Sequence, residues 1–166
     1  EGSKWYDTRP YTVKLEAARR VGYQTVSIVM VRDRHYRAHI ADWVAALEAS
    51  FVRKAAARQL ENVQLEIRII GHNATLAELE NAPSSGCEAG VMAIFTSPSQ
   101  SRSTEAARLL NPDLLHLPLT PHEPMPTFAF PFCPPEMERG ALYEFCLHHT
   151  VTLDDPMPPF CLNTMK

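Results

Sequence analysis

The sequence predicts a three-layer α/β domain with a mainly parallel sheet of four or more strands, followed by a proline-rich C-terminal extension that contains one helix. Over residues 4–120, apolar runs typical of strands alternate with stretches of helical periodicity. Strands separated by helices are typical of right-handed crossovers in a parallel sheet. Ten of the 14 prolines lie at residue 118 or later, where they disfavour regular structure. We therefore expect a domain over 4–120 and an extension over 121–166.

In the first half, Thr12 is a plausible cap of a short helix that ends at Gly22. The run TVSIVMV (25–31) predicts a buried strand, and Asp33 is a plausible cap of the element that follows. Apolar residues then recur at i, i+3, i+4, i+7 and i+11, which indicates a long amphipathic helix. They are Ile40, Trp43, Val44, Leu47 and Phe51.

The second half begins with VQLEIRII (63–70), whose alternation predicts a strand with one less buried face. A short helix capped by Asn73 or by Thr75 with Glu78 follows, and then a buried strand over 89–95. We expect a helix to about residue 110 and a strand over 114–119. Beyond these, an extended segment containing three phenylalanines and a helix near 135–149 complete the prediction.

Composition narrows the function classes. The chain has 166 residues, 45 % hydrophobic residues and a net charge of −3, which argues against a general nucleic-acid binder. No apolar run approaches the roughly 20 residues of a membrane span, so we expect no membrane association. No pattern indicates specific DNA binding. Four scattered cysteines suggest reduced thiols in an intracellular protein, nuclear or cytoplasmic.

The charges are unevenly distributed along the chain. Residues 1–60 hold eleven basic and six acidic residues, a net of +5, whereas residues 118–166 hold two basic and six acidic residues, a net of −4. A local basic face would explain this asymmetry. An intramolecular or head-to-tail contact between the two ends would explain it equally well.

The loop SPSQSRST (97–104) lies between a predicted strand and a predicted helix, where open α/β sheets often bind phosphates. The loop has no glycine and no Walker lysine, so a cap by Ser101 or Ser103 is the first interpretation. An anion site at the strand ends is the second, with histidines that follow the first two strands. Its candidate residues are Ser99, Ser101, Arg102, Ser103, His35 and His72.

No metal, cofactor or catalytic site is predicted. His35 and His39 have helical spacing for a shared metal but lack the glutamate of an H-E-x-x-H motif, so solvation on a helix surface is expected. A Cys₃His set lacks the close cysteine pair of zinc sites, and its cysteines are better explained as small buried hydrophobes. The set comprises Cys133, Cys146, His149 and Cys161.

The order of TVSIVMV, a long amphipathic helix, VQLEIRII, a short helix and GVMAIFTS resembles the anticodon-binding α/β domain of class II aminoacyl-tRNA synthetases. It is similar, too, to the non-catalytic copies of that domain in some nuclear coactivators. The resemblance covers about residues 23–120 and rests on element order, and the segment from 118 onward departs from it. It implies an RNA- or protein-binding module without chemistry of its own, and no family residue is carried over.

The leading hypothesis is therefore a non-catalytic module that binds a protein partner, or a second copy of itself as a homodimer. The apolar extension would make the contact, through Phe128, Phe130 and Phe132. The alternative is an enzyme or sensor that handles a nucleotide or another small anion at the strand ends, with His35 or His72 as acid or base. RNA binding by the basic first half is a third interpretation.

Overall fold

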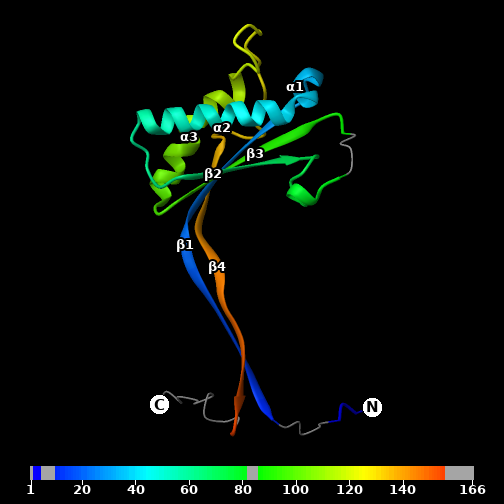
Figure 1. Cartoon of the computed structure of the whole chain (residues 1–166), viewed down its shortest axis with the longest axis vertical. Helices are drawn as coiled ribbons and strands as arrows, with labels where there is room; N and C mark the ends of the chain where they lie inside the picture. Colours follow the sequence, from blue (N-terminus) through cyan, green and yellow to red (C-terminus); the bar gives the residue numbers. More distant parts are fainter. Residues whose placement is uncertain (1, 5–9, 82–85, 156–166) are drawn as a thin grey trace. The chain divides into compact units, whose positions relative to one another are not determined.

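The computed structural model describes residues 2–4, 10–81 and 86–155 (Figure 1). Two long strands, two short strands and three α-helices account for most of this part of the chain. In order, these elements are β1 (Tyr11–Val31), α1 (Arg34–Ala38), α2 (Ile40–Ala57), β2 (Gln64–Ile70), β3 (Ala89–Ser97), α3 (Gln100–His116) and β4 (Glu136–Leu153), with a 3₁₀ turn η1 (Ala77–Leu79) between β2 and β3.

The chain divides into two compact units. The larger unit, Val21–Leu142, holds every helix of the described residues together with β2, β3, the second half of β1 and the start of β4. In the smaller unit, the described residues that form regular structure are 11–20 of β1 and 143–153 of β4. We call this two-stranded unit the ribbon.

The sheet is antiparallel, which corrects the predicted mainly parallel arrangement. Its strand order is β2-β3-β1-β4, and β3 runs antiparallel to both β1 and β2. Val31 pairs with Ala89 and Tyr23 with Ser97. Consequently β1 and β2 run in the same direction, but β3 lies between them.

The connection between β2 and β3 explains why the predicted parallel arrangement is wrong. A parallel neighbour requires a crossover, usually an α-helix, from one end of the sheet to the other. The predicted short helix in this connection is only the three-residue turn η1. The described part of this connection holds no crossover helix, and β3 returns beside β2 in the opposite direction.

The described helices cover one face of the sheet, so the larger unit has two layers rather than the predicted three (Figure 1). The buried core takes alternate residues of the strands, such as Val29, Val91 and Phe95, because successive side chains point to opposite faces. Helix α2 contributes Trp43 and helix α3 contributes Leu110 to the same cluster. None of the described helices is long and apolar enough to cross a membrane.

Three predicted elements are wrong in type. Residues 12–22 belong to strand β1 rather than to a helix, and residues 136–153 form β4 rather than a helix near 135–149. The first half of the predicted strand over 114–119 is the end of α3, which continues through Pro112 to His116, and the second half forms no strand. In β1 and β4, pairing between distant segments overrides the local helical propensity.

Other predictions are confirmed. Helix α2 begins at Ile40 and buries the predicted stripe residues Trp43, Leu47 and Phe51. The Asp33 carboxylate caps α1, accepting hydrogen bonds from the backbone N–H groups of His35 and Tyr36 at 2.8 and 3.1 Å. Strands β2 and β3 lie where the sequence predicts them.

Candidate functional site

The structure separates the residues of the predicted anion site into two groups. His35 and His72 follow β1 and β2, whose carboxyl ends lie beside the start of β3. The serine-rich loop follows the other end of β3. Since β3 spans nine residues, the two groups lie about 25 Å apart along the sheet. They do not form one rim.

Even the two histidines line different hollows. His35 lies in a groove beside the proline-rich segment, whereas His72 lines a smaller hollow of about 380 Å³ with Arg34, Arg37 and His39. His39 contacts Asp42 at 3.6 Å and the His35 ring at 5.1 Å between centroids. Among the described residues, no group of three or more histidine, cysteine or acidic side chains could hold a metal ion.

The serine-rich loop forms a cap, but Ser99 is the capping residue rather than Ser101 or Ser103. The Ser99 hydroxyl accepts a hydrogen bond from the backbone N–H of Arg102 at 3.4 Å. Ser101 is exposed, and the Arg102 guanidinium donates to the carbonyl of Glu61 at 3.1 Å. Only the hydroxyl-rich turn was recognisable from the sequence.

Ser103 is fully buried and belongs to a network that holds α3 on the sheet. Its hydroxyl lies 2.9 Å from that of Thr25 on β1, and the Gln100 amide donates to Thr25 at 2.8 Å. The Thr104 hydroxyl donates to Glu138 of β4 at 2.8 Å. Two of the loop's polar side chains, those of Ser103 and Thr104, therefore join elements of the domain.

The three phenylalanines proposed as partner contacts differ in burial. Phe128 and Phe130 are partly buried against the core of their own chain, whereas Phe132 is 36 % exposed. The Phe128 ring lies 5.0 Å from those of Tyr36 and Trp43 in edge-to-face geometry. Phe128 thus contributes to the domain's own packing.

A groove of about 690 Å³ lies between the end of β1, α1 and residues 123–129. Its volume is in the range of small-molecule sites. The carboxylate of Glu123 lies on its wall, 3.3 Å from the imidazole of His35. Its lining residues are Met30, Arg32, Asp33, His35, Tyr36, Glu123, Pro124, Met125, Pro126, Thr127, Phe128 and Ala129.

The ribbon carries the most exposed cluster of large apolar side chains on one described strand. On β4, Tyr143 is 61 %, Phe145 77 % and Leu147 44 % exposed. These residues alternate along the strand, so they share one face. The sequence signal for this face was a period of two, which a helical interpretation of 135–149 obscured.

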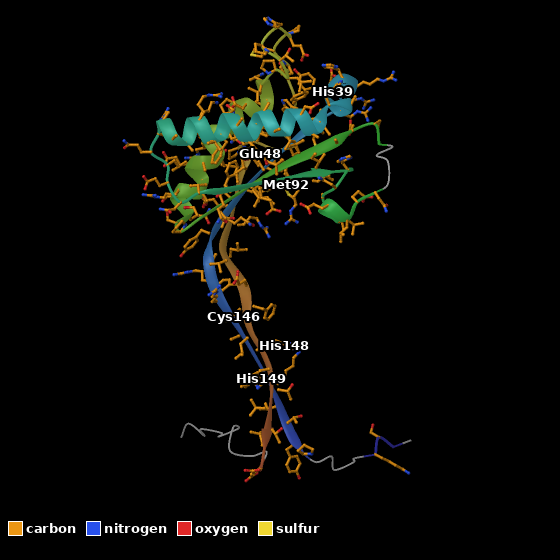
Figure 2. All side chains as sticks on the ribbon, viewed as in Figure 1. His39, Glu48, Met92, Cys146, His148 and His149 are labelled. Atoms are coloured by element: carbon orange, nitrogen blue, oxygen red, sulfur yellow. The ribbon has the colours of Figure 1, made fainter. Side chains whose placement is uncertain are left out.

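Polar contacts fix the pairing of the two ribbon strands. The Arg19 guanidinium donates to the Glu144 carboxylate at 2.8 Å, and the thiol of Cys146 contacts the carbonyl of Ala17 at 3.5 Å. The His148 imidazole lies 3.2 Å from the Glu16 carboxylate. Figure 2 shows His148 on β4, between Cys146 and His149. The Arg19–Glu144 pair shows that the basic and acidic ends of the chain meet within one molecule.

The predicted cysteine set is only partly described. Cys133 and Cys146 are exposed free thiols, so neither is the buried hydrophobe that the sequence favours. Cys133 belongs to the larger unit, whereas Cys146 and His149 belong to the ribbon. Cys161 lies outside the described residues.

Comparison of the chain with protein-family models, with curated proteins and with solved structures finds no match.

Proposed function

We propose that this protein is a non-catalytic interaction module whose ribbon binds a second copy of the chain. The observation that carries the proposal is the exposed apolar face of β4, formed by Tyr143, Phe145 and Leu147. A two-stranded ribbon by itself is only marginally stable in water. Pairing β4 with a strand of a partner would partly cover this face with cross-strand neighbours, which stabilise the ribbon by roughly 0.2–1 kcal/mol for each pair of side chains.

The edge of β4 supports pairing between strands. Strand β4 is the last strand in the order β2-β3-β1-β4, so one of its edges pairs with no other described strand. Such edges offer unpaired N–H and C=O groups to another chain. Two identical edges pair antiparallel about a two-fold axis, the commonest symmetry of dimers.

The pattern of side chains in β4 favours a second copy as the partner. Apolar residues lie at equal distances on either side of His148. Tyr143 and Leu153 form one such pair of positions, and Phe145 and Val151 form another. In an antiparallel pair centred on His148, Tyr143 would lie opposite Leu153 of the second copy. Phe145 would lie opposite Val151, and Glu144 opposite Thr152, so the pairing places no two acidic residues opposite each other.

Sedimentation velocity over a range of concentrations tests the proposal. We expect the wild-type chain to form a dimer, and Phe145→Ser with Leu147→Ser to raise its dissociation constant by at least about tenfold, because each dimer loses both residues twice. Leu79→Ser is the matched control, since Leu79 is 80 % exposed outside the ribbon. A wild-type monomer at all concentrations, or equal effects of ribbon and control variants, would contradict the proposal.

A further inference from the structure

We infer that the groove beside residues 123–129 binds a small apolar amine, whose ammonium group pairs with Glu123. This site is independent of the ribbon proposed above for self-association. Its lining combines apolar side chains with the carboxylate of Glu123, one oxygen of which is buried without a hydrogen-bond partner among the described residues.

The wall of the groove is held in place by its own hydrogen bonds. The backbone N–H of Met30 donates to the carbonyl of Ala129 at 2.8 Å, and that of Phe128 donates to Leu115 at 3.1 Å. The His116 ring lies 2.9 Å from the carbonyl of Pro126. A groove formed in advance loses less entropy when a ligand binds.

Apolar and aromatic side chains form most of the lining. Tyr36 and Phe128 contribute rings in edge-to-face contact, and Met30 and Met125 contribute flexible thioethers. Met125 is 67 % exposed, so a ligand in the groove would cover it. Methionine adapts to the shape of an apolar ligand, and aromatic rings also attract cations.

The polar groups of the groove distinguish an amine from an acid. Arg32 pairs with Glu88 at 3.1 Å, and Asp33 is occupied in capping α1. In Glu123, one carboxylate oxygen contacts His35, while Oε2 is buried without a hydrogen-bond partner among the described residues. The terminal torsion of glutamate is broad, so a small rotation would direct this oxygen into the groove.

A covered carboxylate oxygen without a donor is unfavourable, and a charged N–H donor satisfies it best. The ligand therefore carries an ammonium group, and its remaining body is apolar to match the apolar lining. The buried atom of the lining that lacks a partner, Glu123 Oε2, is an acceptor, which disfavours a carboxylate or phosphate ligand at this position. A small arylalkylamine meets both requirements.

The test compares 2-phenylethylamine, 2-phenylethanol and phenylacetate as probes of similar size, by NMR titration of the ¹⁵N-labelled full chain at neutral pH. We expect the amine to bind with a dissociation constant of about 1 mM and at least about tenfold more tightly than the alcohol. Shifts should concentrate at residues 30–36 and 123–129. Three results would overturn the inference: equal affinities for the amine and the alcohol, a preference for phenylacetate, or no binding of the amine at a concentration 20-fold above the expected dissociation constant.

Variants assign the preference to one side chain. Glu123→Gln should abolish the preference for the amine, because the amide keeps the shape but not the charge. Glu48→Gln removes the same charge from an exposed position on α2 and should leave both affinities unchanged (Figure 2). Met125→Ala should weaken both probes by the same factor. An amine preference that survives Glu123→Gln would refute the role of Glu123, and the dimer measurement is unaffected by either result.

Discussion

Gly22 illustrates how one residue constrains the packing of two strands. A Cβ atom at this position would lie 2.8 Å from the carbonyl oxygen of Ser97 and 3.3 Å from the Thr96 methyl group. The sequence suggests a helix terminus for this glycine, but the structure places it in β1, where backbone approaches backbone closely. The absence of a side chain, rather than an unusual φ, is what the fold requires.

Gly22→Ala should therefore destabilise the larger unit by about 1–3 kcal/mol, because β1 and β3 must separate to admit the methyl group. Chemical denaturation of the variant measures this loss. A free energy of unfolding equal to or higher than that of the wild type would show that the strands accommodate the methyl group without cost.

Glu136 gives a second prediction at the residue scale. Burial by itself raises the pKa of this carboxyl, but hydrogen bonds from Arg108, from its own backbone N–H and from Asn111 outweigh burial, so the pKa lies below its ordinary value of 4.5. A carboxyl whose pKa is lowered by folding stabilises the folded state at pH values above the pKa of the unfolded state. This stabilisation is lost as the pH falls through the pKa of the folded state.

Glu136→Gln should accordingly cost about 1 kcal/mol at pH 7. The difference from the wild type should shrink as the pH falls from about 4.5 through the lower pKa of the folded state, where the wild-type carboxyl also becomes neutral. Urea denaturation of both chains between pH 7 and pH 3 provides the comparison. A difference that stays constant over this range would contradict a lowered pKa.

At the scale of elements, a helix or strand could be predicted from the sequence where its apolar residues recur with a clear local period. Helix α2 was predictable because its apolar stripe recurs over three turns, and β3 because its apolar run is short and bounded by glycine. The second half of β1 was predicted from TVSIVMV, but its first half was not, because VKLEAARR has helical propensity and becomes a strand only through pairing with β4. Strand direction also depends on distant contacts, which no local pattern encodes.

The candidate sites, too, could be predicted only as far as they depend on local sequence. The sequence indicated the polar residues His35 and Ser99, but only the antiparallel sheet shows that they lie at opposite ends of β3. Glu123 was unrecognised because its role depends on the groove, which forms between segments about 90 residues apart. The alternating face of β4 was present in the sequence as Tyr143, Phe145 and Leu147 and could have been found.

The hydroxyl network beneath α3 supports a prediction about how this helix is held. Thr25→Val removes the partner of Ser103, Thr104 and Gln100 while preserving the shape of the side chain. We expect a loss of about 1–3 kcal/mol, because buried polar groups are left unsatisfied. The same change at the half-buried Thr96 of β3 is the matched control, and thermal melts that show equal losses would contradict the importance of the network.

At the scale of the whole molecule, the two units have different stabilising interactions. The larger unit has a buried core of strands and helices, whereas the described part of the ribbon has two strands and exposed apolar side chains. We therefore predict that a second copy stabilises the ribbon, by pairing of the two β4 strands about His148.

Disulfide trapping at position 148 tests this claim most directly. In an antiparallel pair centred on this residue, the two Cα atoms would lie about 4.5–5.5 Å apart, within the range that a disulfide spans. His148→Cys, in a chain whose four native cysteines are changed to serine, should form a covalent dimer on mild oxidation, visible on a non-reducing gel. Val52→Cys, at an exposed position on α2, is the control and should remain monomeric. A chain with His148→Cys that stays monomeric, or that cross-links no faster than the control, would contradict the account.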